Sequence, residues 1–247
     1  SGGTPLVLTA GNKDSREIAP GKTDLIDMVS PFTKWAVEVN HPDAIAQAMQ
    51  KAFRIAMSPP TGPTFVAFTT NALDDKTNVY PTETYNEEIV IKPDEKSIDE
   101  AAKLLVKSQN IGILVGDRLV QTATPFIPTK LAELLGAKVY SSNYSEMIFP
   151  NKHPNYINNL KLGFNSSDEF EEFDTVLAVG GLPRVSYMFS NPKMRIFNPE
   201  SNLIHIDNDP AQVGTTEKTD IGILADPSVA LNKLTAKVEE LLTGNQL

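Results

Sequence analysis

The chain has 247 residues, of which 40% are hydrophobic and 21% are charged. This length suits one large domain or two ordinary ones, and the composition is typical of a folded chain rather than a disordered one. The net charge of −9 argues against a nucleic-acid partner, because phosphate backbones attract basic surfaces. The sequence has no cysteine, so disulfides, thiolate metal sites and a cysteine nucleophile are excluded. It also has neither an apolar run of about 18 residues nor a signal peptide, so we expect a cytoplasmic protein that does not span a membrane.

The first 80 residues combine short apolar runs with one helical stretch. Pro5–Ala10 and Thr64–Phe68 predict buried strands, and residues 41–57 carry apolar side chains at helical spacing. Between that helix and the second strand, residues 58–63 read SPPTGP, a turn that cannot continue a helix. The pattern predicts an α-to-parallel-β crossing. Because a core strand lies so close to the first residue, we expect the chain to be part of a longer one.

A change of composition separates this region from the rest. Residues 71–96 are polar, acidic and irregular, with one short strand expected at Ile89–Ile91. We therefore expect a first domain at 1–80, a linker at 81–96 and a second domain at 97–247.

The second domain alternates helical and apolar segments. Ser97 and Glu100 have the spacing of a capping box at a helix start. Short apolar strands alternate with helical segments, which predicts an α/β fold with a doubly wound, Rossmann-like parallel sheet. The expected strands are 111–116, 138–141, 175–180, 203–207 and 221–224, and the expected helices are 97–108, 124–135, 168–173 and one that begins at 226.

Three segments resemble phosphate-binding motifs. Pro20–Thr23 reads PGKT, the end of a P-loop, but Arg16 stands where that motif needs its first glycine, so we reject this reading. Residues 114–120, LVGDRLV, follow the strand that would cradle a pyrophosphate in a Rossmann fold. Only Gly116 is present there, and Asp117 would repel an anion, so a tight turn is favoured. Residues 178–184, AVGGLPR, combine flexible amides with Arg184, and both a structural turn and an anion site stay open.

The three histidines differ in their surroundings. His205 lies inside an apolar strand and is expected to be packed and hydrogen-bonded, and His41 stands at a helix start as a capping or surface residue. His153 lies in a long loop after the carboxyl end of a parallel strand, where α/β folds place ligands, so loop packing and a catalytic role both stay open. No second histidine or close carboxylate pair has metal-ligand spacing, so no metal site is expected.

The order of motifs along nearly the whole chain resembles the thiamine diphosphate (thiamine pyrophosphate)-dependent decarboxylase family, with benzoylformate decarboxylase as the nearest likeness and acetolactate synthase as a more distant one. The motifs are TPLVLTAG, SPFTKWAVEV, AIAQAMQKAFRIAM, SPPTGPTFVAF, LIHIDNDPAQVG and ILADPSVAL. The resemblance implies that residues 1–80 are the last part of a pyrimidine-binding domain and that residues 97–247 are the central domain.

The resemblance also implies the chemistry. The family binds thiamine diphosphate and Mg²⁺ with an activating glutamate and a Gly-Asp-Gly…Asn motif, and neither stands in this sequence. We therefore expect a fragment of a 2-oxo acid decarboxylase or carboligase that is inactive alone and binds neither cofactor by itself. His153 matches a histidine that the family places in its active site, where it would transfer a proton to the carbanion or enamine left after decarboxylation.

Two other functions stay open. The second domain could be a free-standing Rossmann-like module that binds FAD, NAD or ADP, since acetolactate synthases hold FAD in the central domain. It could also serve only as a spacer that supports oligomerisation. The expected partners are a small 2-oxo acid, the missing domains and, in the parent protein, the other subunits of a homodimer or homotetramer.

Overall fold

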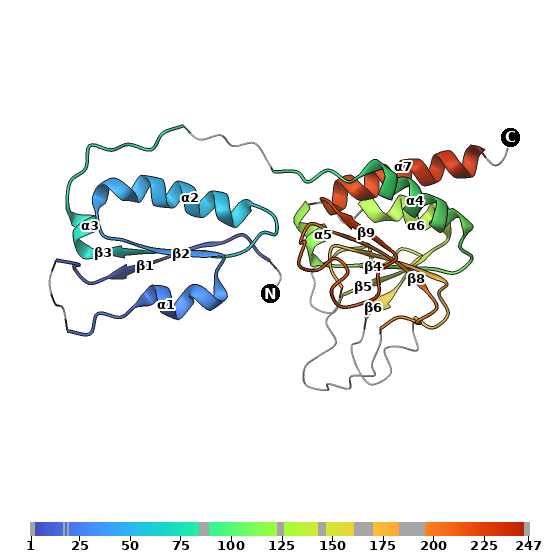
Figure 1. Cartoon of the computed structure of the whole chain (residues 1–247), viewed down its shortest axis with the longest axis horizontal. Coiled ribbons are helices and arrows are strands. Elements are labelled where there is room, and N and C mark those ends of the chain that lie inside the picture. Colours follow the sequence, from blue (N-terminus) through green and yellow to red (C-terminus); the bar gives the residue numbers. More distant parts are fainter. Residues whose placement is uncertain are drawn as a thin grey trace. The chain divides into compact units, whose positions relative to one another are not determined.

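The structure is a computed structural model that describes residues 3–16, 18, 20–83, 89–122, 126–142, 147–160, 170–182 and 196–244. The chain divides into two compact units, Ser1–Ile89 and Val90–Leu247. The division falls inside the segment 81–96. Figure 1 shows that each unit has its own sheet and its own helices.

The first unit is built on a small parallel sheet. Strands β1 (Val7–Asn12), β2 (Trp35–Val39) and β3 (Thr64–Thr69) pair in the order β1-β3-β2. Helix α2 (Ile45–Met57) lies on one face of this sheet and helix α1 (Leu25–Val29) on the other (Figure 1). Strand β3 is buried along nearly its whole length because it is central. The predicted α-to-parallel-β crossing from α2 to β3 is therefore confirmed.

Short helices complete the first unit. They are η1 (Ser30–Phe32), η2 (Pro42–Ala44) and α3 (Thr70–Asp74). His41 precedes η2, and its Nδ1 accepts a hydrogen bond from the backbone N–H of Asp43 over 3.3 Å, so the predicted capping role of His41 is confirmed.

The second unit contains a six-stranded, wholly parallel sheet in the order β6-β5-β4-β7-β8-β9. The strands are β4 (Ile111–Val115), β5 (Lys138–Ser141), β6 (Tyr156–Asn159), β7 (Thr175–Val179), β8 (Asn202–Asp207) and β9 (Ile221–Leu224). The chain starts in the middle at β4, runs outward through β5 and β6, and returns to build β7, β8 and β9 on the other side. This order confirms the predicted doubly wound sheet.

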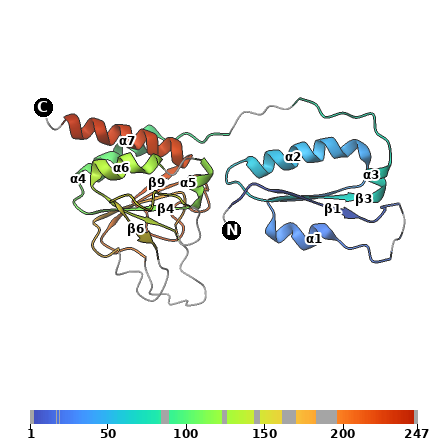
Figure 2. The same cartoon turned by 180° about the vertical axis from the view of Figure 1, so that it is seen from behind.

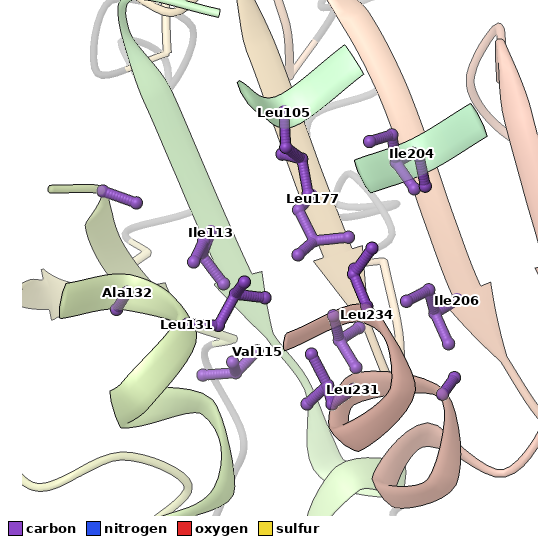
Figure 3. Packing of buried hydrophobic residues seen from close by; sticks show 14 of the residues in the cluster. Leu105, Ile113, Val115, Leu131, Ala132, Leu177, Ile204, Ile206, Leu231 and Leu234 are labelled. Atoms are coloured by element: carbon purple, nitrogen blue, oxygen red, sulfur yellow. The ribbon is translucent and has the colours of Figure 1, made fainter. Parts of the chain in front are cut away.

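Helices of the second unit bury the sheet. They are α4 (Glu95–Lys107), α5 (Asp117–Thr122), α6 (Ile127–Leu135) and α7 (Pro227–Gly244). In Figures 1 and 2, α4, α6 and α7 lie on the same face of the sheet. Figure 3 shows Leu131, Leu231 and Leu234 directed at the strands, and all three are fully buried. Burial of each such side chain stabilises the fold by about 1.5–3 kcal/mol.

Strand β6 was not predicted. Its sequence is YINN, and alternate residues are exposed because it is an edge strand with a neighbour on one side only. Without a continuous apolar run, the sequence carries no signal that separates this strand from the loop around it.

Helix α4 begins earlier than the capping box predicted. Asp94 is the N-cap, and its side chain accepts a hydrogen bond from the backbone N–H of Ser97 over 2.9 Å. Ser97 lies inside the first turn, so its assignment as the cap was wrong. Asp94 competes successfully because it stands three residues before Ser97, the spacing at which a carboxylate reaches an orphan N–H. These hydrogen bonds to Ser97 also lower the pKa of the Asp94 carboxyl.

Two smaller expectations have other outcomes. Residues 89–91 form no strand. The helix expected at 168–173 lies partly on residues outside the described ranges, and residues 170–172 form turns.

The start of α7 gives a first testable prediction. Asp226 is buried, and its Oδ1 accepts hydrogen bonds from the backbone N–H groups of Ser228 and Val229 over 2.8 and 3.1 Å. Asp226→Ala should lower the free energy of unfolding by about 1 kcal/mol, because it leaves those donors unpaired. Asp226→Asn is the matched control, since an amide oxygen also caps. Urea unfolding of both variants checks this, and equal losses would contradict the capping role.

Candidate functional site

The second sheet has one topological switch point. From β4 the chain moves toward β5, and from the adjacent β7 it moves toward β8, on opposite sides. Open α/β sheets bind ligands in the crevice that forms where two neighbouring strands lead away in this manner. The carboxyl ends of β4 and β7, with the neighbouring end of β8, are therefore the candidate site.

A buried ion pair spans this edge. Arg118, at the start of α5, donates from Nε to Asp207 Oδ1 and from Nη2 to Asp207 Oδ2, each over 2.6 Å. Asp207 ends β8 and is fully buried, whereas the Arg118 side chain is 20% exposed. The two parallel hydrogen bonds form a bidentate guanidinium–carboxylate pair, the strong form of this interaction. The pair joins α5 to β8 across the end of β7.

The pKa of the Asp207 carboxyl is lowered from its ordinary value. Burial is the largest influence and would raise the pKa, but His205, the hydrogen bonds and charge of Arg118, and the backbone N–H of Asp209 together outweigh it. That N–H donates to Asp207 Oδ1 over 2.9 Å. Asp207 is therefore held as a carboxylate.

His205 lies two residues before Asp207 and therefore on the same face of β8. It is fully buried, and its Nε2 lies 3.6 Å from Asp207 Oδ2, just beyond hydrogen-bonding distance. Within the described ranges neither ring nitrogen has a hydrogen-bond partner. The prediction that His205 is packed is confirmed, but the prediction that it is hydrogen-bonded was wrong, because strand alternation places the ring against an apolar face.

Two glycines allow the loops at this edge to touch. A Cβ on Gly116 would lie 2.5 Å from the carbonyl oxygen of Gly180, and a Cβ on Gly180 would lie 2.4 Å from the backbone nitrogen of Leu119. Gly180 also has φ of +72°, which side-chain-bearing residues rarely adopt. The predicted tight turn after β4 is therefore a close contact between the backbones that follow β4 and β7.

His153 does not lie at this edge. It precedes β6, where Asn155 accepts a hydrogen bond through its carbonyl from the N–H of Val139, near the start of β5. His153 therefore lies at the amino edge of the sheet. A parallel partner for β5 must start at the same edge as β5, so the chain between the two strands returns from the carboxyl end to the amino end. The expectation that His153 lies near the carboxyl ends was wrong for this reason.

The His153 ring is held on both sides. Its Nε2 lies 3.1 Å from Glu133 Oε1 at the end of α6, and its Nδ1 accepts a hydrogen bond from the N–H of Asn155 over 3.3 Å. Since Nδ1 is an acceptor, Nε2 carries the proton and donates to Glu133. The ring also packs edge-on against Phe149, with 5.1 Å between ring centroids. The His153 side chain is only 14% exposed.

The other residues singled out in the sequence lie apart from the switch point. Arg184 is outside the described residues. The PGKT segment belongs to the first unit, where Lys22 Nζ lies 3.2 Å from Glu38 Oε1. Within the part of the chain that the structure describes, no three histidine, aspartate or glutamate side chains gather as metal ligands, and no helix is long and apolar enough to cross a membrane.

Sequence reasoning missed Arg118 and Asp207 as a pair. The available signal was a charged residue directly after each of two buried strands that meet at one edge of the sheet. Their separation of 89 residues in the sequence carries no spacing rule that would connect them.

Comparison with known proteins identifies the family. Residues 98–234 match the family described as "Thiamine pyrophosphate enzyme, central domain". The chain belongs to this family of thiamine pyrophosphate-dependent enzymes, and the predicted family membership is confirmed.

Curated relatives extend the similarity over both units. The chain is 27% identical over 246 residues to a probable acetolactate synthase large subunit from Methanocaldococcus jannaschii, an alignment that covers 94% of this chain and 41% of that protein. It is 26% identical over 227 residues to the acetolactate synthase of Mycobacterium bovis, covering 87% of this chain and 35% of that protein. The chain thus spans about two fifths of the length of these relatives.

Solved structures share the fold. A putative thiamin diphosphate-dependent enzyme from Mycobacterium smegmatis superposes with a TM-score of 0.85 at 23% identity, covering 96% of this chain and 46% of that one. A 4-hydroxybenzoylformate decarboxylase from Rhodococcus jostii gives 0.82 at 20% identity, with coverages of 96% and 47%. At these identities the likeness establishes the fold.

Proposed function

We propose that this chain is the scaffold segment of a longer thiamine pyrophosphate-dependent enzyme that removes carbon dioxide from a 2-oxo acid. The continuous alignment over 94% of the chain with an acetolactate synthase large subunit supports this proposal most directly, since it includes both units. The cofactor supplies an ylid that attacks the oxo group and an electron sink for the resulting carbanion. Thiamine pyrophosphate and Mg²⁺ are bound by parts of the protein outside this chain, in a dimer or tetramer.

The fate of the carbanion divides two candidate reactions. The order of motifs from TPLVLTAG to SPPTGPTFVAF supports a benzoylformate decarboxylase-like enzyme that protonates the carbanion and releases an aldehyde. The names of the curated relatives favour the alternative, a carboligase that adds the carbanion to a second 2-oxo acid. The aldehyde-releasing reaction is our proposal.

Product analysis of the longer protein distinguishes the two reactions. With thiamine pyrophosphate and Mg²⁺, benzoylformate should yield benzaldehyde, measured by NADH consumption in a coupled alcohol dehydrogenase assay. Pyruvate should yield no acetolactate, measured after acid conversion to acetoin. Acetolactate as the main product would replace the proposal with the carboligase, and the absence of both products would contradict both.

His153 was assigned a catalytic role through the resemblance, and that role stays a proposal. Its contacts with Glu133 and Asn155 favour a competing role as an anchor for the loop before β6. We expect His153→Ala in the longer protein to leave kcat within about tenfold. The same change should lower Tm by several degrees, because two hydrogen bonds of about 1 kcal/mol each are lost.

The kinetic measurement separates the anchor from a proton donor. Loss of a general acid lowers the rate by about 10²–10⁴. A fall of that size in kcat at unchanged Tm would establish the catalytic role and contradict the anchor. Glu133→Gln is the matched control, since it keeps an acceptor for His153 and should change neither quantity appreciably.

A further inference from the structure

We infer that the second unit takes no dinucleotide at its switch point and that the longer protein is independent of flavin. The central sheet has the strand order of dinucleotide-binding folds, so the family fold and the acetolactate synthase relatives both raise the question of such a ligand. The flavin part of this inference deepens the proposed function and rests on it. Backbone donors, space and charge at this edge all point to the same result.

The backbone donors that would bind a pyrophosphate are already used. In dinucleotide folds the N–H groups of the first strand–helix turn point at the pyrophosphate. Here Gly116 donates its N–H to the carbonyl of Val179 over 2.8 Å, and Arg118 donates its N–H to the carbonyl of Gly180 over 2.9 Å. Gly180 in turn donates to the carbonyl of Ile206 over 2.9 Å. The turns after β4, β7 and β8 thus satisfy one another.

The space that a pyrophosphate needs is filled by the chain itself. In a dinucleotide fold a glycine lets the ligand approach the backbone. At this edge Gly116 instead lets the Gly180 carbonyl approach, to 2.5 Å from where a Cβ would stand, and the carbonyl oxygen of Gly181 lies 2.9 Å from the same point. The glycine therefore serves a contact between two segments of protein backbone.

The charges at this edge also oppose an anionic ligand. Both arms of the Arg118 fork are bound to Asp207, so the nearest cation is neutralised by a buried carboxylate. Asp117 adds a second acidic residue in the first turn of α5. The residue that ends β5 is Ser141, whereas dinucleotide folds place there an acidic side chain that binds the ribose hydroxyl.

Flavin analysis and nucleotide titration test the inference. The longer protein, purified without added cofactor, should release no flavin on acid denaturation, as judged by visible absorbance and fluorescence. The 247-residue chain should give no heat of binding and no shift of Tm with FAD, NAD⁺ or ADP, whereas a bound ligand at 100 times its Kd would stabilise the chain by about 2.7 kcal/mol. Stoichiometric flavin, or saturable binding of any of the three nucleotides, would overturn the inference.

The same preparation keeps this result apart from the proposed function. Carbon dioxide release from a 2-oxo acid by protein that contains flavin would overturn the inference and leave the proposed function standing. Flavin-free protein with no such activity would do the reverse.

Discussion

Replacing Arg118 with methionine should lower the free energy of unfolding of the second unit by about 3 kcal/mol. The change leaves Asp207 fully buried and without its cation. Removal of one partner of a buried pair typically costs about 3–5 kcal/mol, and the partial exposure of Arg118 places this pair at the lower end. Once the guanidinium is gone, burial should dominate and raise the pKa of Asp207.

The double variant Arg118→Met with Asp207→Asn tests the cause. Neutralising the carboxylate should restore part of the lost stability, because no buried charge then lacks a partner. Lys130→Met is the control, since its pair with Glu239 is exposed and contributes about 0–1 kcal/mol. A double variant less stable than Arg118→Met would contradict the account.

This pair also predicts a dependence on pH. The folded-state pKa of Asp207 lies below its unfolded value, so its stabilising contribution is fully present above the unfolded pKa and is lost as pH falls through the folded pKa. The stability advantage of the native chain over Asp207→Asn should therefore be constant from about pH 5 to 7 and shrink below about pH 4. Urea unfolding across this range measures it, and an advantage independent of pH would contradict the assignment.

Gly180→Ala should be the other severe substitution, with a loss of about 2–5 kcal/mol. Its backbone has φ of +72°, and the new methyl group would lie 2.4 Å from the backbone nitrogen of Leu119. Backbone cannot move aside as a flexible side chain can, so the turns after β4 and β7 would have to separate. The left-handed conformation alone accounts for about 1–2 kcal/mol of the loss.

Gly136→Ala is a matched control for this substitution. Gly136 has φ of +60°, but a Cβ there would meet nothing within 4 Å. Its variant should therefore lose only the conformational part, about 1–2 kcal/mol. Equal losses at Gly136 and Gly180 would show that the close backbone contact contributes nothing.

The chain carries its own reporter for these experiments. Its single tryptophan, Trp35, lies in β2 of the first unit. Unfolding of the second unit should be followed by far-UV circular dichroism or amide hydrogen exchange, while Trp35 fluorescence reports the first unit. A change in the Trp35 transition on substitution at Arg118 or Gly180 would show that the effect is not confined to the second unit.

The sequence predicted the buried part of the fold well. Strands β4 and β7 are buried at every residue, and such continuous apolar runs identify themselves. Strand β6 escaped because its polar edge sequence resembles a loop, and α5 because only six residues separate its start from its end. Strong local patterns were therefore sufficient for the core and insufficient at its margins.

The candidate site was harder to predict than the core. Gly116 was correctly placed in a tight turn, but its packing against Gly180 is a contact between segments far apart in the sequence. The Arg118–Asp207 pair depends in the same way on the order of strands, which single-sequence patterns do not specify. His153 was placed at the wrong edge because the loop that contains it returns across the sheet before β6 begins.

Carbon dioxide release is the most direct test of the central proposal, that this chain is the scaffold of a thiamine pyrophosphate-dependent enzyme whose cofactor chemistry lies elsewhere in the protein. The longer protein, stripped of cofactor, should release carbon dioxide from a 2-oxo acid only after thiamine pyrophosphate and Mg²⁺ are added, and the 247-residue chain should release none under the same conditions. Release by the 247-residue chain alone, or release by the stripped protein without thiamine pyrophosphate, would contradict the account.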